Sequence, residues 1–312
     1  MKGWKKVLTG VIIGGSILAS TLIPGCNKEA YSSHYIVDEW AVMEGCSSSG
    51  NFTLKGVPEQ KMIVKQPIVY IRSEGEIKDL DLSVKISELA GEDSVYTYPK
   101  TGLSGSEISW KDIKVTNSLD QIQNPKESSN QDLDSLLSTL NNVDSNTLEY
   151  NSLKSKFLFY EAAVNFENPV QISYDRDKVV IKNVGKYALE NLVFSAEFPS
   201  NESPVFGKVY FATAGKLAPN EEVSLPLSEK APDYEIFKQD LLNLGFSEKE
   251  AESFVNVWGA PLLSPSLRGV SAQLVFRIPE DVYNKILPLS ATPSPAEVNR
   301  AMYVAVDVNS GK

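Results

Sequence analysis

Residues 53–116 contain apolar runs and a stretch in which apolar and polar side chains alternate, as strands do when one face of a sheet is buried. Four apolar residues at every second position mark one such strand: Leu80, Leu82, Val84 and Ile86. The run from Pro67 to Ile71 is β-branched and aromatic, a composition favoured in strands. The pattern predicts a small β-rich module over residues 53–116, with a correspondingly modest core.

Residues 117–154 are polar at first and then show a helical period. Four leucines recur at positions i, i+3, i+4 and i+7: Leu133, Leu136, Leu137 and Leu140. This spacing places them on one face of a short helix, with the apolar stripe toward a core. Pro125 and its polar neighbours favour a linker or long loop. We therefore expect a linker and a short helix in this stretch.

Residues 155–312 predict a second module that begins with strands. Five short strands are separated by polar turns: Phe157–Tyr160, Val179–Asn183, Leu192–Phe198, Val209–Phe211 and Val223–Leu225. Strands at this spacing are typical of an immunoglobulin-like β-sandwich. The run from Val179 to Leu227 also resembles the adhesion-type β-sandwich repeats of secreted bacterial proteins. The predicted class is α+β and β-dominated, with immunoglobulin-like sandwich elements and short helical insertions.

A helical hairpin follows, beginning with a helix over residues 234–244. Ser247 and Glu250 have the spacing of a capping box, in which each side chain satisfies a backbone N–H left open at a helix start. The second helix carries an apolar stripe and is expected to end at Gly259. Trp258, the last residue of the stripe, is interpreted as a core anchor rather than a ligand platform.

The chain then returns to strand periodicity at 270–278 and 304–308, with a short helix over 280–287 between them. Most of residues 155–308 resembles an uncharacterised module of secreted and envelope bacterial proteins. Four segments carry this resemblance: Lys156–Glu161, Glu250–Trp258, Arg277–Pro279 and Leu287–Leu289. The resemblance implies one fold unit and supplies no chemistry.

The first 25 residues have the layout of a secretory signal peptide. Three lysines precede an uncharged, mostly apolar run from Val7 to Ile23, and a cysteine follows at Cys26. This end resembles the lipobox of bacterial lipoproteins, with Ile23 and Gly25 in the expected positions and Pro24 departing from the usual Ala or Ser. The resemblance implies that Cys26 receives diacylglycerol, becomes the mature N-terminus and tethers the chain to a membrane.

Two other interpretations of this end remain open. The apolar run is at the short limit for a spanning helix, so it could persist as an uncleaved anchor. An ordinary signal peptidase could instead cut after the small residues of Ala19–Thr21. If Cys26 is lipidated, Cys46 has no intrachain partner; otherwise a Cys26–Cys46 disulfide is the natural alternative.

Residues 26–52 are Ser-rich and are predicted to be a flexible stalk. Three aromatic residues lie within it: Tyr31, Tyr35 and Trp40. They are expected to dock on the folded body, with the lipid interface as the alternative. The only histidine, His34, also lies in this segment, which argues against a histidine-based nucleophile or zinc site in the body.

The chain of 312 residues has a net charge of −10, which becomes −13 when residues 1–25 and their three lysines are removed. An acidic body argues against nucleic acid as a partner. Three carboxylate pairs are interpreted as solvated surface acids, with calcium as the alternative: Asp79/Asp81, Asp132/Asp134 and Asp175/Asp177. Glu161 and Glu197 lie within apolar runs. Because side chains alternate along a strand, both carboxylates are expected to point away from the core.

These observations favour a non-catalytic binding or structural module of the cell envelope, on the extracytoplasmic side of a membrane. We expect no enzyme activity and no cofactor, and a membrane contact through lipid on Cys26. An envelope protein or a glycan is the expected partner. The alternative is a carboxylate-dependent hydrolase of cell-wall or polysaccharide material, because the sequence does not show which acids face each other.

Overall fold

The computed structural model describes residues 34–49, 60–86, 96–117, 122, 131–199, 207–231 and 233–309. The predicted signal peptide (1–25) and Cys26 lie outside these residues, so lipidation stays a prediction. Within the described ranges, none of the helices has the length and apolar character needed to cross a membrane. Residues 33–312 form one compact unit.

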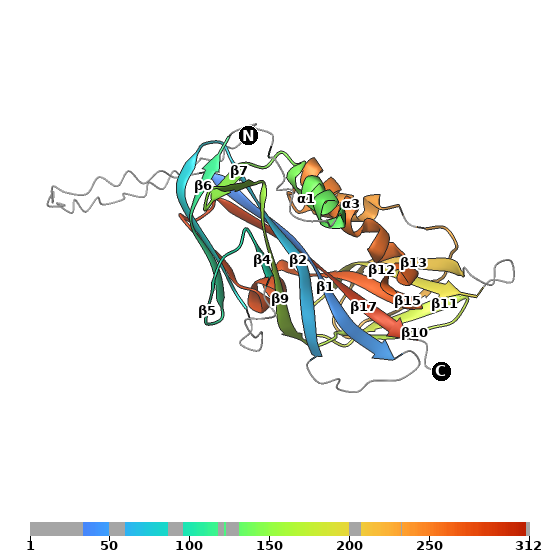
Figure 1. The fold of residues 1–312 in the computed structure, drawn as a ribbon. Helices are drawn as coiled ribbons and strands as arrows, with labels where there is room; N and C mark the ends of the chain where they lie inside the picture. Colours follow the sequence, from blue (N-terminus) through green and yellow to red (C-terminus); the bar gives the residue numbers. More distant parts are fainter. Residues whose placement is uncertain are drawn as a thin grey trace, which may run out of the picture. The chain divides into compact units, whose positions relative to one another are not determined.

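An eight-stranded sheet forms the centre of this unit (Figure 1). Its strands, from edge to edge, are β13 (Lys208–Leu217), β12 (Leu189–Phe198), β15 (Ala272–Ile278), β17 (Glu297–Asn309), β1 (Tyr35–Ser49), β2 (Gln60–Ser73), β9 (Phe157–Phe166) and β4 (Tyr96–Tyr98). β1 and β17 pair in parallel, whereas the other neighbours are antiparallel. The first described strand of the chain and its last therefore lie side by side at the middle of the sheet.

Two smaller sheets complete the β structure. One contains β16 (Leu289–Thr292), β3 (Ile77–Lys85), β6 (Glu107–Thr116), β7 (Thr147–Tyr150), β8 (Leu153–Ser155) and β5 (Leu103–Ser104), and the other contains β10 (Val170–Tyr174), β11 (Lys178–Asn183) and β14 (Glu222–Pro226). Apolar residues of both sheets share one core with one face of the large sheet. Val37, Leu82 and Ile181 are fully buried members of this core.

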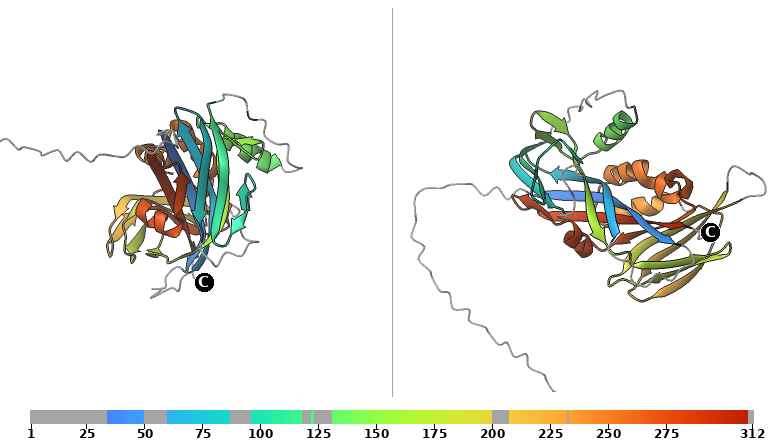
Figure 2. Two further views of the ribbon diagram at one scale, coloured as in Figure 1. Left: turned by 90° about the vertical axis from the view of Figure 1, so that its left-hand side faces the viewer. Right: turned by 60° about the horizontal axis from the view of Figure 1, so that its bottom comes forward.

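The opposite face of the large sheet is covered by helices, as the right-hand view of Figure 2 shows. These are α1 (Gln131–Asn141), α2 (Glu235–Asn243) and α3 (Glu248–Leu263), followed by a 3-10 turn, η2 (Pro265–Arg268). Leu140, Phe237 and Phe254 pack with Trp40 and Tyr303 of the sheet in a second apolar core. α4 (Glu280–Ile286) contributes Tyr283 to the first core instead.

The predicted β-dominated α+β class is confirmed, and so are the capped helical hairpin and the leucine-striped helix. The end of α3 was predicted wrongly, because the helix continues past Gly259 to Leu263 with Pro261 inside it. Pro261 has no backbone N–H to donate to the carbonyl four residues before it, and the helix ends two residues later. The two-module division is also wrong, since residues 53–116 and 155–312 belong to one unit joined by the pairing of β2 with β9.

The predicted flexible stalk over residues 26–52 is wrong where the structure describes it. Tyr35–Ser49 is strand β1, paired on both sides by β17 and β2. Tyr35 and Trp40 are fully buried, so the predicted docking on the body is confirmed for both; Tyr31 lies outside the described residues. Between Tyr35 and Met43, β1 is buried on both faces and therefore lacks the alternation that marks a half-buried strand.

Candidate functional site

A polar cleft lies between α1 and α3, with a volume of about 470 Å³. Figure 1 shows the two helices next to each other above the large sheet. Their described lining residues are Ile122, Ser138, Thr139, Asn141, Asn142, Lys249, Glu252, Ser253 and Asn256. α1 buries Leu137 and Leu140 and turns its polar C-terminal end to the cleft. α3 presents residues spaced three or four apart, which share one helix face.

Several of these side chains have unused hydrogen-bonding capacity. Ser138, Asn142 and Asn256 are exposed, and no hydrogen bond from their side chains to another described residue is found. Ser253 is buried and shares a hydrogen bond with the Tyr70 hydroxyl at 3.2 Å. Because amides both donate and accept, the cleft offers groups suited to a neutral, polar ligand.

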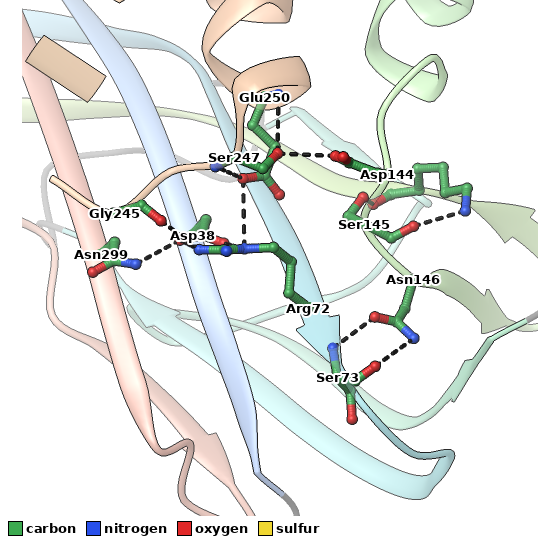
Figure 3. A network of polar contacts seen from close by, with 11 residues as sticks. Asp38, Arg72, Ser73, Asp144, Ser145, Asn146, Gly245, Ser247, Glu250 and Asn299 are labelled. Atoms are coloured by element: carbon green, nitrogen blue, oxygen red, sulfur yellow. Dashed lines mark hydrogen bonds and ion pairs between the residues drawn. The ribbon is translucent and has the colours of Figure 1, made fainter. Parts of the chain in front are cut away.

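A network of two buried carboxyls and the partly exposed Arg72 lies under the first turn of α3 (Figure 3). Arg72 on β2 donates two hydrogen bonds to the Asp38 carboxylate of β1, one of them from Nη2 to Oδ1 at 3.0 Å. The same guanidinium lies 3.7 Å from Glu250 Oε2 and donates to the Gly245 carbonyl at 2.6 Å. Asn299 on β17 donates to Asp38 at 2.8 Å. Three strands of the sheet are thereby connected to the α2–α3 junction.

Glu250 has a second role as part of the predicted capping box, which the structure confirms. The Ser247 hydroxyl accepts a hydrogen bond from the Glu250 backbone N–H, and Glu250 Oε2 accepts one from the Ser247 backbone N–H at 2.9 Å. Burial, together with the nearby charge of Asp38, raises the pKa of Glu250 to about 7. Burial also raises the pKa of Asp38, against the opposing effect of Arg72.

The segment after α1 is connected to the same region. The Ser247 hydroxyl donates to Asp144 at 2.9 Å, and Asn146 exchanges hydrogen bonds with the Ser73 backbone on β2. Figure 3 shows both contacts on the α1 side of the network. Both walls of the cleft are therefore fixed to strand β2, the α3 wall through Glu250 and Ser253 and the α1 wall through the segment that follows it.

Two further buried ion pairs lie elsewhere in the large sheet. Glu39 bonds to Arg300 and Tyr160 within the sheet, on the face opposite to Asp38, and Arg300 stacks over Tyr283 at 3.8 Å. On the helical face, Asp240 accepts hydrogen bonds from Arg277 and Tyr303, each at 2.7 Å. These contacts join strands to α4 and α2 and do not line the cleft.

The acids named from the sequence whose side chains the structure describes lie away from the cleft. Asp79 is exposed, Asp81 accepts a hydrogen bond from the Asp112 backbone, and Asp175 accepts two in its own turn. Within the described part of the chain, His, Cys, Asp and Glu side chains do not form a metal-binding group of three. The side chains of Asp132 and Asp134 are outside that part.

Glu161 and Glu197 are partly exposed, as predicted, and Glu197 accepts the Gly207 backbone N–H at 3.0 Å. Trp258 is 7% exposed and belongs to the helical-face core, so the core interpretation is confirmed. Asp38 was not predicted as a site residue because residues 26–52 were interpreted as a stalk. The run Tyr35–Met43 around it is otherwise largely apolar, and that composition was the available signal.

No protein-family model matches the chain, and no curated protein matches its sequence. Solved structures similar to it include a yeast delta-COP-I mu-homology domain complexed with a Dsl1 WxWxV peptide. That alignment has 10% sequence identity and a TM-score of 0.35, and covers 88% of this chain and 98% of that one. A second structure of the yeast delta-COP-I mu-homology domain aligns over the same shares with a TM-score of 0.33.

Proposed function

We propose that this chain is a non-catalytic binding module of a cell envelope, anchored by lipid on Cys26 on the extracytoplasmic side of a membrane. The observation that carries the binding role is the polar cleft of about 470 Å³ between α1 and α3. The anchor rests on the resemblance of residues 1–26 to a lipoprotein signal. An immunoglobulin-like arrangement of the strands between Val170 and Pro226 belongs to the same proposal, supported by the separate small sheet of β10, β11 and β14.

A hydroxyl-rich, neutral molecule such as an envelope glycan is the ligand class that the cleft supports. Its described lining contains amide and hydroxyl groups and two charged side chains, Lys249 and Glu252. The carboxylate of Glu252 is already bonded to Lys238 at 2.8 Å. Ile122 is the only apolar side chain among the described lining residues. Protein interfaces depend on apolar and aromatic anchors, so an envelope protein fits this cleft less well than a glycan.

The alternative, a carboxylate-dependent hydrolase, has less support. Such an enzyme needs two acids beside the substrate. Asp38 and Glu250 are fully buried and do not line the cleft, where Glu252 is the only acid among the described lining residues. The acids that the fold brings together therefore support α3 rather than face a ligand.

The test is a calorimetric titration of the purified full chain with soluble oligosaccharides of N-acetylglucosamine, glucose and xylose. We expect one series to bind and Asn256→Ala to weaken that binding about 5-fold, because a neutral hydrogen bond contributes about 1 kcal/mol. Lys249→Ala is a second variant in the cleft. Its control is Lys114→Ala on the exposed side of β6, and this control should bind the sugar like the wild type. Binding unaffected by either cleft variant would refute the cleft, and release of shorter sugars would favour the hydrolase.

A further inference from the structure

Besides the apolar packing of Phe254, two polar contacts connect the first two turns of α3 with the large sheet. Glu250 lies 3.7 Å from Arg72, and Ser253 shares a hydrogen bond with Tyr70; both partners are on β2. Lys249 and Glu252 of the same turns line the cleft, together with Asn256 at the start of the third turn. The position of this wall of the cleft therefore depends on how firmly the first turns of α3 are attached to β2.

The charges under this turn are not balanced. Two fully buried carboxyls, Asp38 and Glu250, share one guanidinium, Arg72. Asp38 receives two hydrogen bonds from Arg72 and one from Asn299. Glu250 Oε2 receives one from the Ser247 backbone, and Glu250 Oε1 is buried without a hydrogen-bond partner among the described residues. An ionised Glu250 is thus the less compensated of the two acids, and burying such a charge is unfavourable.

The groups that face Glu250 from neighbouring elements do not correct this imbalance. Asp38 on β1 is acidic, as is Glu297 on β17, whose charge acts on Asp38 and Arg72. Asp144, in the segment after α1, bonds to Ser247 at the same helix start. Tyr70 is neutral, and burial raises its pKa far above the neutral range. Arg72 is therefore the one cation facing Glu250 in this described set.

We propose that Glu250 is a proton-controlled latch: the protonated carboxyl keeps the first turns of α3 seated on the sheet, and loss of the proton loosens them and the cleft wall they form. Its importance for ligand binding rests on the proposed function, but the latch itself operates without a ligand. The pKa of about 7 for Glu250 places the change in the physiological range. Because the folded pKa is raised, the attachment is strongest in acid and weakens as the pH rises from about 4.5 to about 7.

Hydrogen–deuterium exchange of the full chain without ligand tests the latch directly. From pH 5.5 to pH 8, after correction for the intrinsic exchange rate, opening of residues 247–256 should increase about 30-fold, given a pKa near 4.5 in the open state. Glu250→Gln should abolish this dependence, since glutamine keeps the capping acceptor without the charge. Glu248→Gln, whose carboxylate is 72% exposed, should behave like the wild type.

Asp38→Asn provides a second variant, which removes the negative charge beside Glu250. Glu250 should then ionise more easily in the folded state, and residues 247–256 should open less at pH 8 than in the wild type. Wild-type exchange that does not change with pH would overturn the latch, as would a pH dependence that survives in Glu250→Gln. Loss of glycan binding with the latch intact would refute the proposed function alone. Intact binding with pH-independent exchange would refute the latch alone.

Discussion

Replacing Glu250 with glutamine is expected to stabilise the whole fold in alkaline solution and to change it little in acid. Glu250 is fully buried beside Asp38, and its carboxylate is compensated by one backbone N–H and by Arg72 at 3.7 Å. Glutamine has a similar volume and retains the acceptor that the Ser247 backbone needs. The substitution therefore removes an unfavourable buried charge without removing the cap.

The magnitude follows from the difference between the folded and unfolded proton affinities. The pKa rises from 4.5 to about 7 on folding. A difference of about 2.5 corresponds to about 3 kcal/mol at 1.36 kcal/mol per pKa unit. The folded state retains its proton longer, so stability is fully present below pH 4.5 and falls until about pH 7. The pKa of about 7 already includes the attraction to Arg72, so the glutamine variant should be more stable than the wild type by about 3 kcal/mol at pH 8.

Urea unfolding at pH 5 and pH 8 measures this difference, with Glu248→Gln as the exposed control on the same helical turn. The wild type should lose stability between the two pH values relative to Glu250→Gln. If Glu250→Gln is less stable than the wild type at pH 8, Glu250 is a favourable partner of Arg72, and the reasoning about the charge imbalance is wrong.

Three other substitutions have expected outcomes. Cys26→Ala should release the protein from the membrane fraction or block its processing, and unchanged lipid labelling of that variant would contradict lipidation. Ser247→Ala should lower stability by about 1 kcal/mol, measured by urea unfolding, because the hydroxyl caps α3. Trp258→Ala should cost about 3–5 kcal/mol, since the ring is in the core; an unchanged melting temperature with lost ligand binding would make Trp258 a ligand platform.

Local elements were largely predictable because their signals lie within a few neighbouring residues. The alternation at Leu80–Ile86 became β3, and the Ser247–Glu250 pair capped α3 as expected. The end of α3 shows the limit of such signals: the helix was expected to end at Gly259 but continues through Pro261 to Leu263. β1 left no comparable local sign, because a strand that is buried on both faces loses its alternation.

The candidate site combines features that local sequence predicts with features that depend on contacts between distant segments. The polar face of α3 follows from its spacing, yet the cleft exists only because α1, about a hundred residues earlier in the chain, lies beside it. Glu250 was identified as a capping residue, but not as a member of a buried acid pair. Asp38 lies in a segment that was interpreted as a stalk, so its ion pair with Arg72 was not predicted.

The sequence by itself determined the β-dominated class, most helices and strands, and the expectation of a lipid-anchored N-terminus. Periodicity indicates which side of a helix or strand is buried, and capping residues indicate where a helix begins. Tertiary structure alone decided that β1 lies between β2 and β17, and that Asp38, Arg72 and Glu250 meet beneath α3. The physical reason is that periodicity specifies a buried face without its partner, whereas the protonation of a buried acid depends on neighbours from distant parts of the chain.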